Sequence, residues 1–130
     1  MSRYLLDTHA LLWMISGDSR LSERVCEIVR DPKNKLFFSM AGYWELCIKL
    51  SLGKLSLQKN WEKHLDNELK TNGIQMLSIY PEHCREVVNL PFIHRDPFDR
   101  LMIAQCHVEF ASLLSAEGQM KKYPNLNVIW

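Results

Sequence analysis

Short apolar runs alternate with longer amphipathic segments along the chain, and this alternation predicts strands separated by helices. The runs of strand type are residues 4–6, 35–39, 74–79, 111–115 and 126–130. Each crossover through a helix returns the chain to the same end of the sheet, so successive strands are expected to lie parallel. The pattern predicts a three-layer α/β/α sandwich around a central, mainly parallel sheet of four to five strands, built as one domain over residues 1–130.

Turn and capping residues mark the ends of the predicted helices. Ser22 is placed to cap a helix that stops at residues 31–32, where Asp is followed by Pro. Asn60 is placed to cap a helix that ends at the sequence TNG, and Pro81 suits the first turn of the next helix. Residues 117–123 form a short polar segment that is compatible with a helix before the last strand.

The apolar positions of two helices indicate which side chains face the core. In the segment MAGYWELCIKLSLGK, we expect Trp44, Cys47 and Ile48 to point inward. In the helix that follows Pro81, we expect Val87 and Val88 to lie on the apolar face. These positions predict the sides of the two helices that pack against the sheet.

Composition excludes several classes of protein. Of the 130 residues 47% are hydrophobic, with only 5 Gly and 5 Pro, which suits a packed domain rather than a disordered segment. The 16 basic and 15 acidic residues leave a formal charge of +1, so any polyanion must bind to a local patch. No stretch approaches the ~20 apolar residues of a membrane-spanning helix. Asp7 and His9 interrupt the apolar run that a signal peptide needs, so we expect a cytoplasmic protein without a membrane segment.

The cysteines and histidines do not have metal-site spacing. Cysteine stands at Cys26, Cys47, Cys84 and Cys106, and histidine at His9, His64, His83, His94 and His107. Neither a Cys-x-x-Cys nor a His-x-x-x-His pair occurs among them. We therefore expect reduced cysteines in the core and no metal role for the histidines.

Four acids are positioned to meet at one edge of the predicted sheet. Asp7 directly follows the first strand, Glu45 lies in the helix after the second strand, Asp99 is near the start of a later helix, and Glu117 follows the fourth strand. Ligands in such folds bind at the carboxyl ends of the strands. Neighbouring carboxylates repel unless a cation lies between them, and an all-oxygen set suits Mg²⁺ or Mn²⁺. Such ions typically handle phosphates.

Each acid also has an ordinary structural interpretation. Asp7 or Thr8 can cap the first helix, and Glu45 with Lys49 has the i,i+4 spacing of a surface ion pair. The sequence from 96 to 99 makes a normal helix start, and Glu117 alone suits a surface position. The functional interpretation depends on the acids converging, and so on the predicted topology.

Four motifs carry a resemblance to a known family. LLDTHALLW, SMAGYWELCIKLSLGKL, HRDPFDRLMIAQ and LLSAEGQMKKYPNLNVIW, in this order and covering nearly the whole chain, resemble a PIN-domain protein of the VapC toxin type. The resemblance implies a Mg²⁺- or Mn²⁺-dependent endoribonuclease that hydrolyses RNA, forms a homodimer, and pairs with a VapB-like antitoxin through which it meets DNA. Carried over by motif, Asp7, Glu45 and Asp99 match the family's acids, with Asp96 as second choice.

The chain departs from the family pattern at two positions. Where the family commonly has Thr or Ser, one residue, and then Asp, this chain has Ser115 and Glu117, which puts the fourth ligand in doubt. A small hydroxylic residue is also common where Gly42 stands, so support for Glu45 is expected to be weaker. Thr8 and Ser115 are either supports for the ligands or plain helix caps.

Local cations and aromatic residues are candidates for RNA contacts. The candidate phosphate contacts are Lys49, Arg95, Arg100, Lys121 and Lys122. Taken singly, each of them also suits a solvated surface. Trp13, Trp44 and Trp61 can stack on bases if exposed, but core packing is the default expectation for all three.

Two other functions compete with the nuclease. One is a catalytically weak PIN-fold binding module that acts mainly through an antitoxin complex. The other is a receiver-like phosphoacceptor, which lacks support here because neither adjacent acids after the first strand nor a lysine after the last strand is present.

Overall fold

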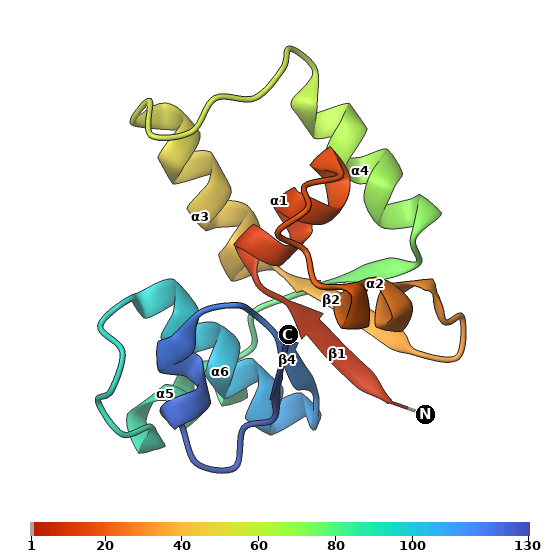
Figure 1. Ribbon diagram of the computed structural model, residues 1–130. Coiled ribbons are helices and arrows are strands. Elements are labelled where there is room, and N and C mark those ends of the chain that lie inside the picture. Colours follow the sequence, from red (N-terminus) through yellow and green to blue (C-terminus); the bar gives the residue numbers. More distant parts are fainter. Residues whose placement is uncertain (1) are drawn as a thin grey trace.

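The computed structural model describes residues 2–130, and within them five strands alternate with six α-helices and one 3-10 helix (Figure 1). In chain order the elements are β1 Arg3–Leu6, α1 Thr8–Ser16, α2 Glu23–Arg30, β2 Lys35–Ser39, α3 Met40–Ser51, α4 Trp61–Thr71, β3 Ile74–Leu77, α5 Pro81–Asn89, α6 Pro97–Glu109, β4 Ser112–Leu114, η1 Gly118–Lys122 and β5 Val128–Ile129. No helix among these residues has the length and apolar character to cross a membrane.

The five strands form one sheet in the order β3-β2-β1-β4-β5, and every neighbouring pair is parallel. Leu5 of the central strand β1 is paired with Phe37 of β2 on one side and with Leu113 of β4 on the other. The predicted parallel sheet between helices is confirmed. Because all strands point the same way, their carboxyl ends lie along a single edge.

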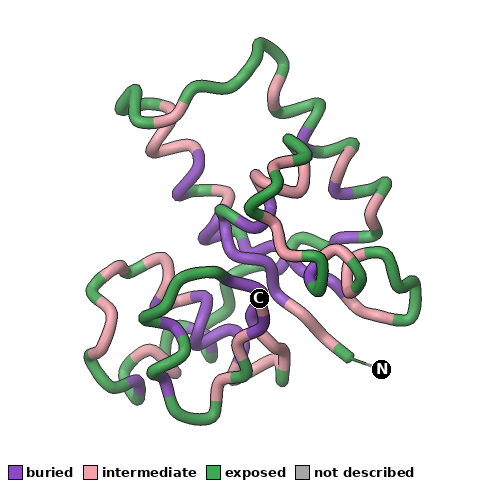
Figure 2. The backbone as a smooth tube through the Cα atoms, viewed as in Figure 1, coloured by how far each residue is buried: buried purple, intermediate pink, exposed green. Residues whose placement is uncertain are grey.

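Adjacent residues of a strand belong to different cores, because both faces of the sheet are covered. Leu5 and Leu113 pack in one cluster with α6, while Leu6 and Leu114 pack in the other with α1, α2 and α4. In Figure 1, α5 and α6 lie together on one side of the strands. Figure 2 shows the buried residues concentrated along the strands, where the two cores meet.

Helix boundaries follow the local signals with one exception. Ser22 Oγ accepts a hydrogen bond from the Val25 amide at 3.2 Å, and Pro81 begins α5, as predicted. Asn60 stands at the N-cap position of α4 but has a left-handed backbone (φ 65°) and makes no capping hydrogen bond with its side chain. Its tolerance of positive φ, rather than its side-chain oxygen, accounts for asparagine at this position.

Three predicted core positions are wrong. Trp44 is 61% exposed and Val88 is 84% exposed. α3 has apolar residues on several sides and turns Ala41, Glu45 and Leu46 inward instead of Trp44, while the buried residue of α5 is His83. Cys84 is also exposed, although all four cysteines are free, as expected.

Candidate active site

Asp7 ends the central strand and begins the first helix. Its Oδ1 accepts a hydrogen bond from the Ala10 amide at 2.8 Å, so the predicted capping role is confirmed. The side chain is nevertheless buried at the carboxyl edge of the sheet. Burial raises the pKa of Asp7, and the Ser115 hydroxyl and the Ala10 amide oppose this effect by stabilising the carboxylate. Asp7 therefore both caps α1 and belongs to the group of acids at this edge of the sheet.

Glu45 is buried although it makes the i,i+4 ion pair that a surface helix would make. Its Oε2 lies 3.4 Å from Lys49 Nζ, and its Oε1 accepts a hydrogen bond of 2.6 Å from the Thr8 hydroxyl. Thr8 is itself buried in the first turn of α1. The hydroxyl of α1 and the ammonium of α3 therefore fix the position of this carboxylate between the two helices.

The ring of Phe38 explains why position 42 is a glycine. A Cβ placed at Gly42 would lie 2.7 Å from Phe38 Cε1 and 3.1 Å from Thr8 Oγ1. Phe38 is fully buried at the end of β2 and leaves no space for a side chain at position 42. Glu45 thus gains its hydroxyl support from Thr8 on the neighbouring helix.

Asp96 and Asp99 lie at the start of α6. Asp96 Oδ1 accepts hydrogen bonds from the amides of Phe98 and Asp99 at 2.8 and 3.1 Å, so Asp96 caps the helix. Asp99 is in the first turn, and its Oδ2 lies 3.0 Å from His94 Nε2, although the imidazole N–H is not aligned for a hydrogen bond. The other ring nitrogen of His94 accepts from the Asp96 amide at 3.1 Å.

The pKa of Asp99 reports how closely the acids gather. Burial is the largest cause of its rise to about 8, and the negative charges of Asp96, Glu45, Asp7 and Glu117 raise it further, in that order. These charges come from four separate parts of the chain. The same acids line one cavity at this edge of the sheet, which confirms the predicted convergence.

Glu117 follows β4 and is exposed. Its Oε1 accepts from the Gln119 amide at 3.1 Å, and its own amide donates to Ser115 Oγ at 3.0 Å. Ser115 is buried and holds the turn that carries Glu117. Glu117 is therefore both a surface residue and a member of the acidic group.

The acids line a cavity of about 190 Å³. Its lining consists of Asp7, Thr8, His9, Glu45, Lys49, His94, Asp96, Asp99 and Glu117. Sequence spacing did not predict His9 and His94 in this lining, because neither belongs to a metal-site pattern. The sequence could have indicated these two histidines, because each lies within five residues of a predicted acid. They stand in the motifs LLDTH and HRDPFD.

The donor set fits a hard divalent cation that keeps much of its water. Among residues 2–130, no three His, Cys, Asp or Glu side chains are close enough together to enclose a metal ion. Mg²⁺ is usually bound through one or two carboxylates with several retained waters, so a closed cage is not required. The repulsion that raises the pKa of Asp99 is the kind that a cation relieves.

The predicted RNA contacts are only partly supported by position. Of the five candidate cations in the described chain, Lys49 alone lines the acid cavity. Arg95, Lys121 and Lys122 are exposed but lie outside the cavity lining. Arg100 is wrong as a phosphate contact, because it is buried and its guanidinium donates to the Pro91 carbonyl at 3.0 Å.

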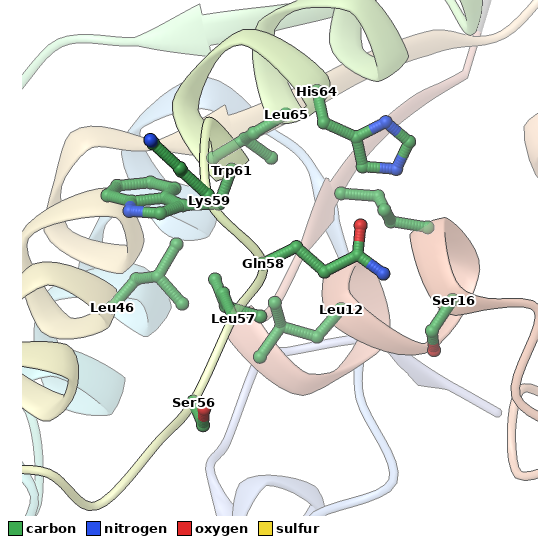
Figure 3. A pocket seen from close by; sticks show the side chains of 11 residues that line it. Leu12, Ser16, Leu46, Ser56, Leu57, Gln58, Lys59, Trp61, His64 and Leu65 are labelled. Atoms are coloured by element: carbon green, nitrogen blue, oxygen red, sulfur yellow. The ribbon is translucent and has the colours of Figure 1, made fainter.

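Two further hollows continue from the acid cavity along α1. A groove of about 480 Å³ shares Thr8, His9 and Lys49 with the acid cavity. Beyond it lies a mainly apolar hollow of about 400 Å³, which shares Leu12 and Ser16 of α1 with the groove (Figure 3). In Figure 3, side chains from α1, α3, α4 and the segment between α3 and α4 surround this hollow, and no acid of the described chain is among its lining residues.

Comparisons with known proteins agree on the fold. The sequence model of the PIN domain matches residues 4–126. Among solved structures, the chain resembles VapBC2 from Rickettsia felis bound to a DNA fragment from their promoter, with 16% identity, a TM-score of 0.76, and coverage of 98% of this chain and 97% of that chain. It also resembles DNA-bound VapBC from Salmonella typhimurium, with 12% identity, a TM-score of 0.70, and coverage of 99% and 98%. For VapBC-1 from nontypeable Haemophilus influenzae the identity is 19%, the TM-score 0.65, and the coverage 98% and 96%. A search of curated proteins gave no significant match.

Proposed function

The chain belongs to the PIN domain family, and from this premise we propose that it is a Mg²⁺- or Mn²⁺-dependent endoribonuclease that acts as the toxin of a VapC-type toxin–antitoxin pair. One observation carries the proposal. Five acids from four separate parts of the chain line one cavity, and burial and the neighbouring acids raise the pKa of Asp99. A fold that keeps such a repulsive group together is expected to use it.

Asp7, Glu45 and Asp99 are the residues that would hold the metal, with Asp96 and Glu117 in support. A bound divalent cation lowers the pKa of water and offsets charge that develops on phosphoryl oxygens. The chain's own groups keep the acids in place. Thr8 holds Glu45 at 2.6 Å, and the Ala10 amide holds Asp7 at 2.8 Å.

Lys49 is proposed to bind a substrate phosphate in addition to pairing with Glu45. Its ammonium lies 3.4 Å from Glu45 and lines the acid cavity, so it is within reach of a phosphate that enters there. Hydrolysis by water would leave a 3′-hydroxyl and a 5′-phosphate. We assign Lys49 to phosphate binding and to electrostatic balance of Glu45.

The proposed partners are an RNA substrate and a VapB-like antitoxin. The solved structures with similar folds are described as VapBC complexes, two of them with DNA. For this chain we propose an antitoxin complex in the cytoplasm, with DNA contacted only through the antitoxin, and a homodimer of the toxin. Light scattering of the purified protein at micromolar concentration tests the dimer, and a monomer there would reject it.

Cleavage of RNA by the purified protein tests the nuclease directly. Total cellular RNA is incubated with Mg²⁺, with Mn²⁺ or with EDTA, and the new 5′ ends are mapped. We expect cleavage with either metal, none with EDTA, and none for Asp7→Asn or Asp99→Asn. The matched control is Asp66→Asn, which makes the same chemical change at an exposed position of α4. Equal cleavage by Asp7→Asn and wild type would reject the assigned site.

A second function is favoured by one observation. The described acids do not enclose a ready-made metal position, which suits a catalytically weak binding module that works mainly through its antitoxin. This function predicts an intact antitoxin complex without metal-stimulated cleavage of any cellular RNA. The same cleavage experiment therefore separates the two.

A further inference from the structure

The groove next to the acid cavity is built from α1 and the segment after it, and from the end of α3 and the segment that follows. Three of its lining residues, Thr8, His9 and Lys49, also line the acid cavity, so the two hollows lie next to each other. The groove measures about 480 Å³. This volume falls within the range of about 300–1,000 Å³ that is typical of small-ligand sites.

One wall of the groove carries two aromatic rings. His9 and Trp13 are four residues apart on α1, so they lie on the same side of the helix, with ring centroids 5.7 Å apart. Trp13 is held by the edge of Trp130, with centroids 5.5 Å apart, and by the Arg20 guanidinium, whose carbon lies 4.7 Å from the ring centroid. Trp13 is half-buried and His9 is exposed. Trp13 is thus held in position, and both rings line the groove.

The groove also carries uncompensated positive charge. Arg20 is neutralised by Asp18, with Nη2 2.7 Å from Oδ2. Lys49 has a partner in Glu45, on the side of the acid cavity. Lys54 is exposed and forms no ion pair within the described chain. Lysine ammonium groups beside a hollow with aromatic walls are the combination that binds single-stranded nucleic acid.

We propose that this groove binds one unpaired nucleotide of the RNA substrate, the one that flanks the phosphodiester in the acid cavity. Its base stacks on His9 and Trp13, and its phosphate contacts Lys54, with Lys49 between the two hollows. This assignment rests on the proposed nuclease function. It implies that the enzyme acts on RNA where the base beside the cleavage point is unpaired, because a paired base cannot reach the rings.

RNA fits this groove better than an acidic peptide does. A peptide carboxylate would satisfy Lys54 but would leave the aromatic rings without a planar partner, and it would have no reason to continue into a cavity lined by five acids. A nucleotide chain has a phosphate at every residue. Its next phosphate is therefore carried into the acid cavity, where the proposed metal site lies.

The test measures binding of a fluorescein-labelled single-stranded RNA of about ten nucleotides by anisotropy, in the Asp99→Asn background so that the RNA stays intact. His9→Ala, Trp13→Leu and Lys54→Ala are compared with Lys33→Ala, which replaces an exposed lysine before β2, at the opposite end of the strands. We expect each groove variant to weaken binding about tenfold and the control to leave it unchanged.

Salt dependence separates the two kinds of contact. Lys54→Ala should lower the slope of log Kd against log salt by about 0.7, because one phosphate contact is lost. Trp13→Leu should leave the slope unchanged, since a stacked base releases no counterions. In otherwise wild-type enzyme, Lys54→Ala should raise KM about tenfold while kcat stays within about twofold, because Lys54 lines the groove but not the acid cavity.

Two results would overturn the assignment. The first is that the groove variants bind RNA as tightly as Lys33→Ala does. Because His9 and Lys54 are exposed, their variants give this comparison even if Trp13→Leu does not fold. Circular dichroism checks the folding of Trp13→Leu. The other is equal competition by poly-glutamate and by unlabelled RNA, which would indicate a groove for acidic peptide. Wild-type cleavage of the same RNA is measured in parallel, so loss of the groove assignment and loss of the nuclease function give different outcomes.

Discussion

Replacing Asp99 with asparagine is expected to stabilise the metal-free protein at neutral and alkaline pH. The folded protein raises the pKa of Asp99 from 3.8 to about 8, chiefly by burial and then through the surrounding acids. An acid with a raised folded pKa stabilises the fold most below its unfolded pKa, and this contribution is lost as the pH rises toward the folded pKa. Wild type should therefore lose stability between about pH 4 and about pH 8.

The size of the effect follows from the two pKa values. Each pH unit between them changes the free energy of unfolding by about 1.4 kcal/mol for one group. Between about pH 5 and about pH 8, Asp99 accounts for a loss of about 3–4 kcal/mol. Asn has nearly the same shape and no charge, and the Asp99 amide stays bonded to the Asp96 cap. The variant should lack this part of the pH dependence.

Urea unfolding in EDTA at several pH values measures the difference between the two proteins. Asp66→Asn, exposed on α4, serves as the matched control and should follow wild type. Parallel stability curves for wild type and Asp99→Asn across this pH range would refute the reasoning, because they would mean that Asp99 ionises normally. Added Mg²⁺ should raise the melting temperature of wild type more than that of the variant, since it binds only the folded acids.

Three further substitutions test the surroundings of the site. Gly42→Ser should destabilise the fold by about 1–3 kcal/mol through contact with Phe38, and in urea titrations Phe38→Leu should reduce that loss in the double variant. Thr8→Val removes the hydroxyl that holds Glu45 and should slow RNA cleavage about 10–100-fold, whereas Thr8→Ser should restore it in the same initial-rate assay. Replacing the exposed Glu117 with Ala should lower the initial rate only about tenfold, and equal inactivity of Glu117→Ala and an alanine variant of Asp7 would identify Glu117 as a direct ligand.

The parallel direction of the strands could be predicted because each strand is short, apolar and separated from the next by a helical pattern. Leu5 and Leu6 are consecutive and both fully buried, which is typical of a parallel sheet that is covered on both faces. The convergence of Asp7 and Asp99 followed from that topology. Their roles as ligands, the metal and the RNA stay predictions.

The positions that were wrong depend on tertiary packing. The spacing of Trp44 fits an inward position, but α3 is apolar on several sides, and the neighbouring Phe98 of α6 packs edge-on against the Trp44 ring at 5.3 Å on the surface. Arg100 looks like a surface cation in the sequence. It is buried because the Pro91 carbonyl and the Tyr123 hydroxyl accept its hydrogen bonds, and these partners lie 9 and 23 residues away.

The position of β4 beside β1 bears on how the protein is made. The central strand β1 comprises residues 3–6, but one of its two neighbours is β4, residues 112–114, which are synthesised much later. In a nascent chain whose Leu113 and Glu117 are still inside the ribosome, one side of β1 is therefore unpaired and the acid cavity lacks Glu117. The acid cavity is complete only after residues 112–117 have left the ribosome and β4 has paired with β1. Under the proposed nuclease function, a shorter growing chain therefore lacks the complete site.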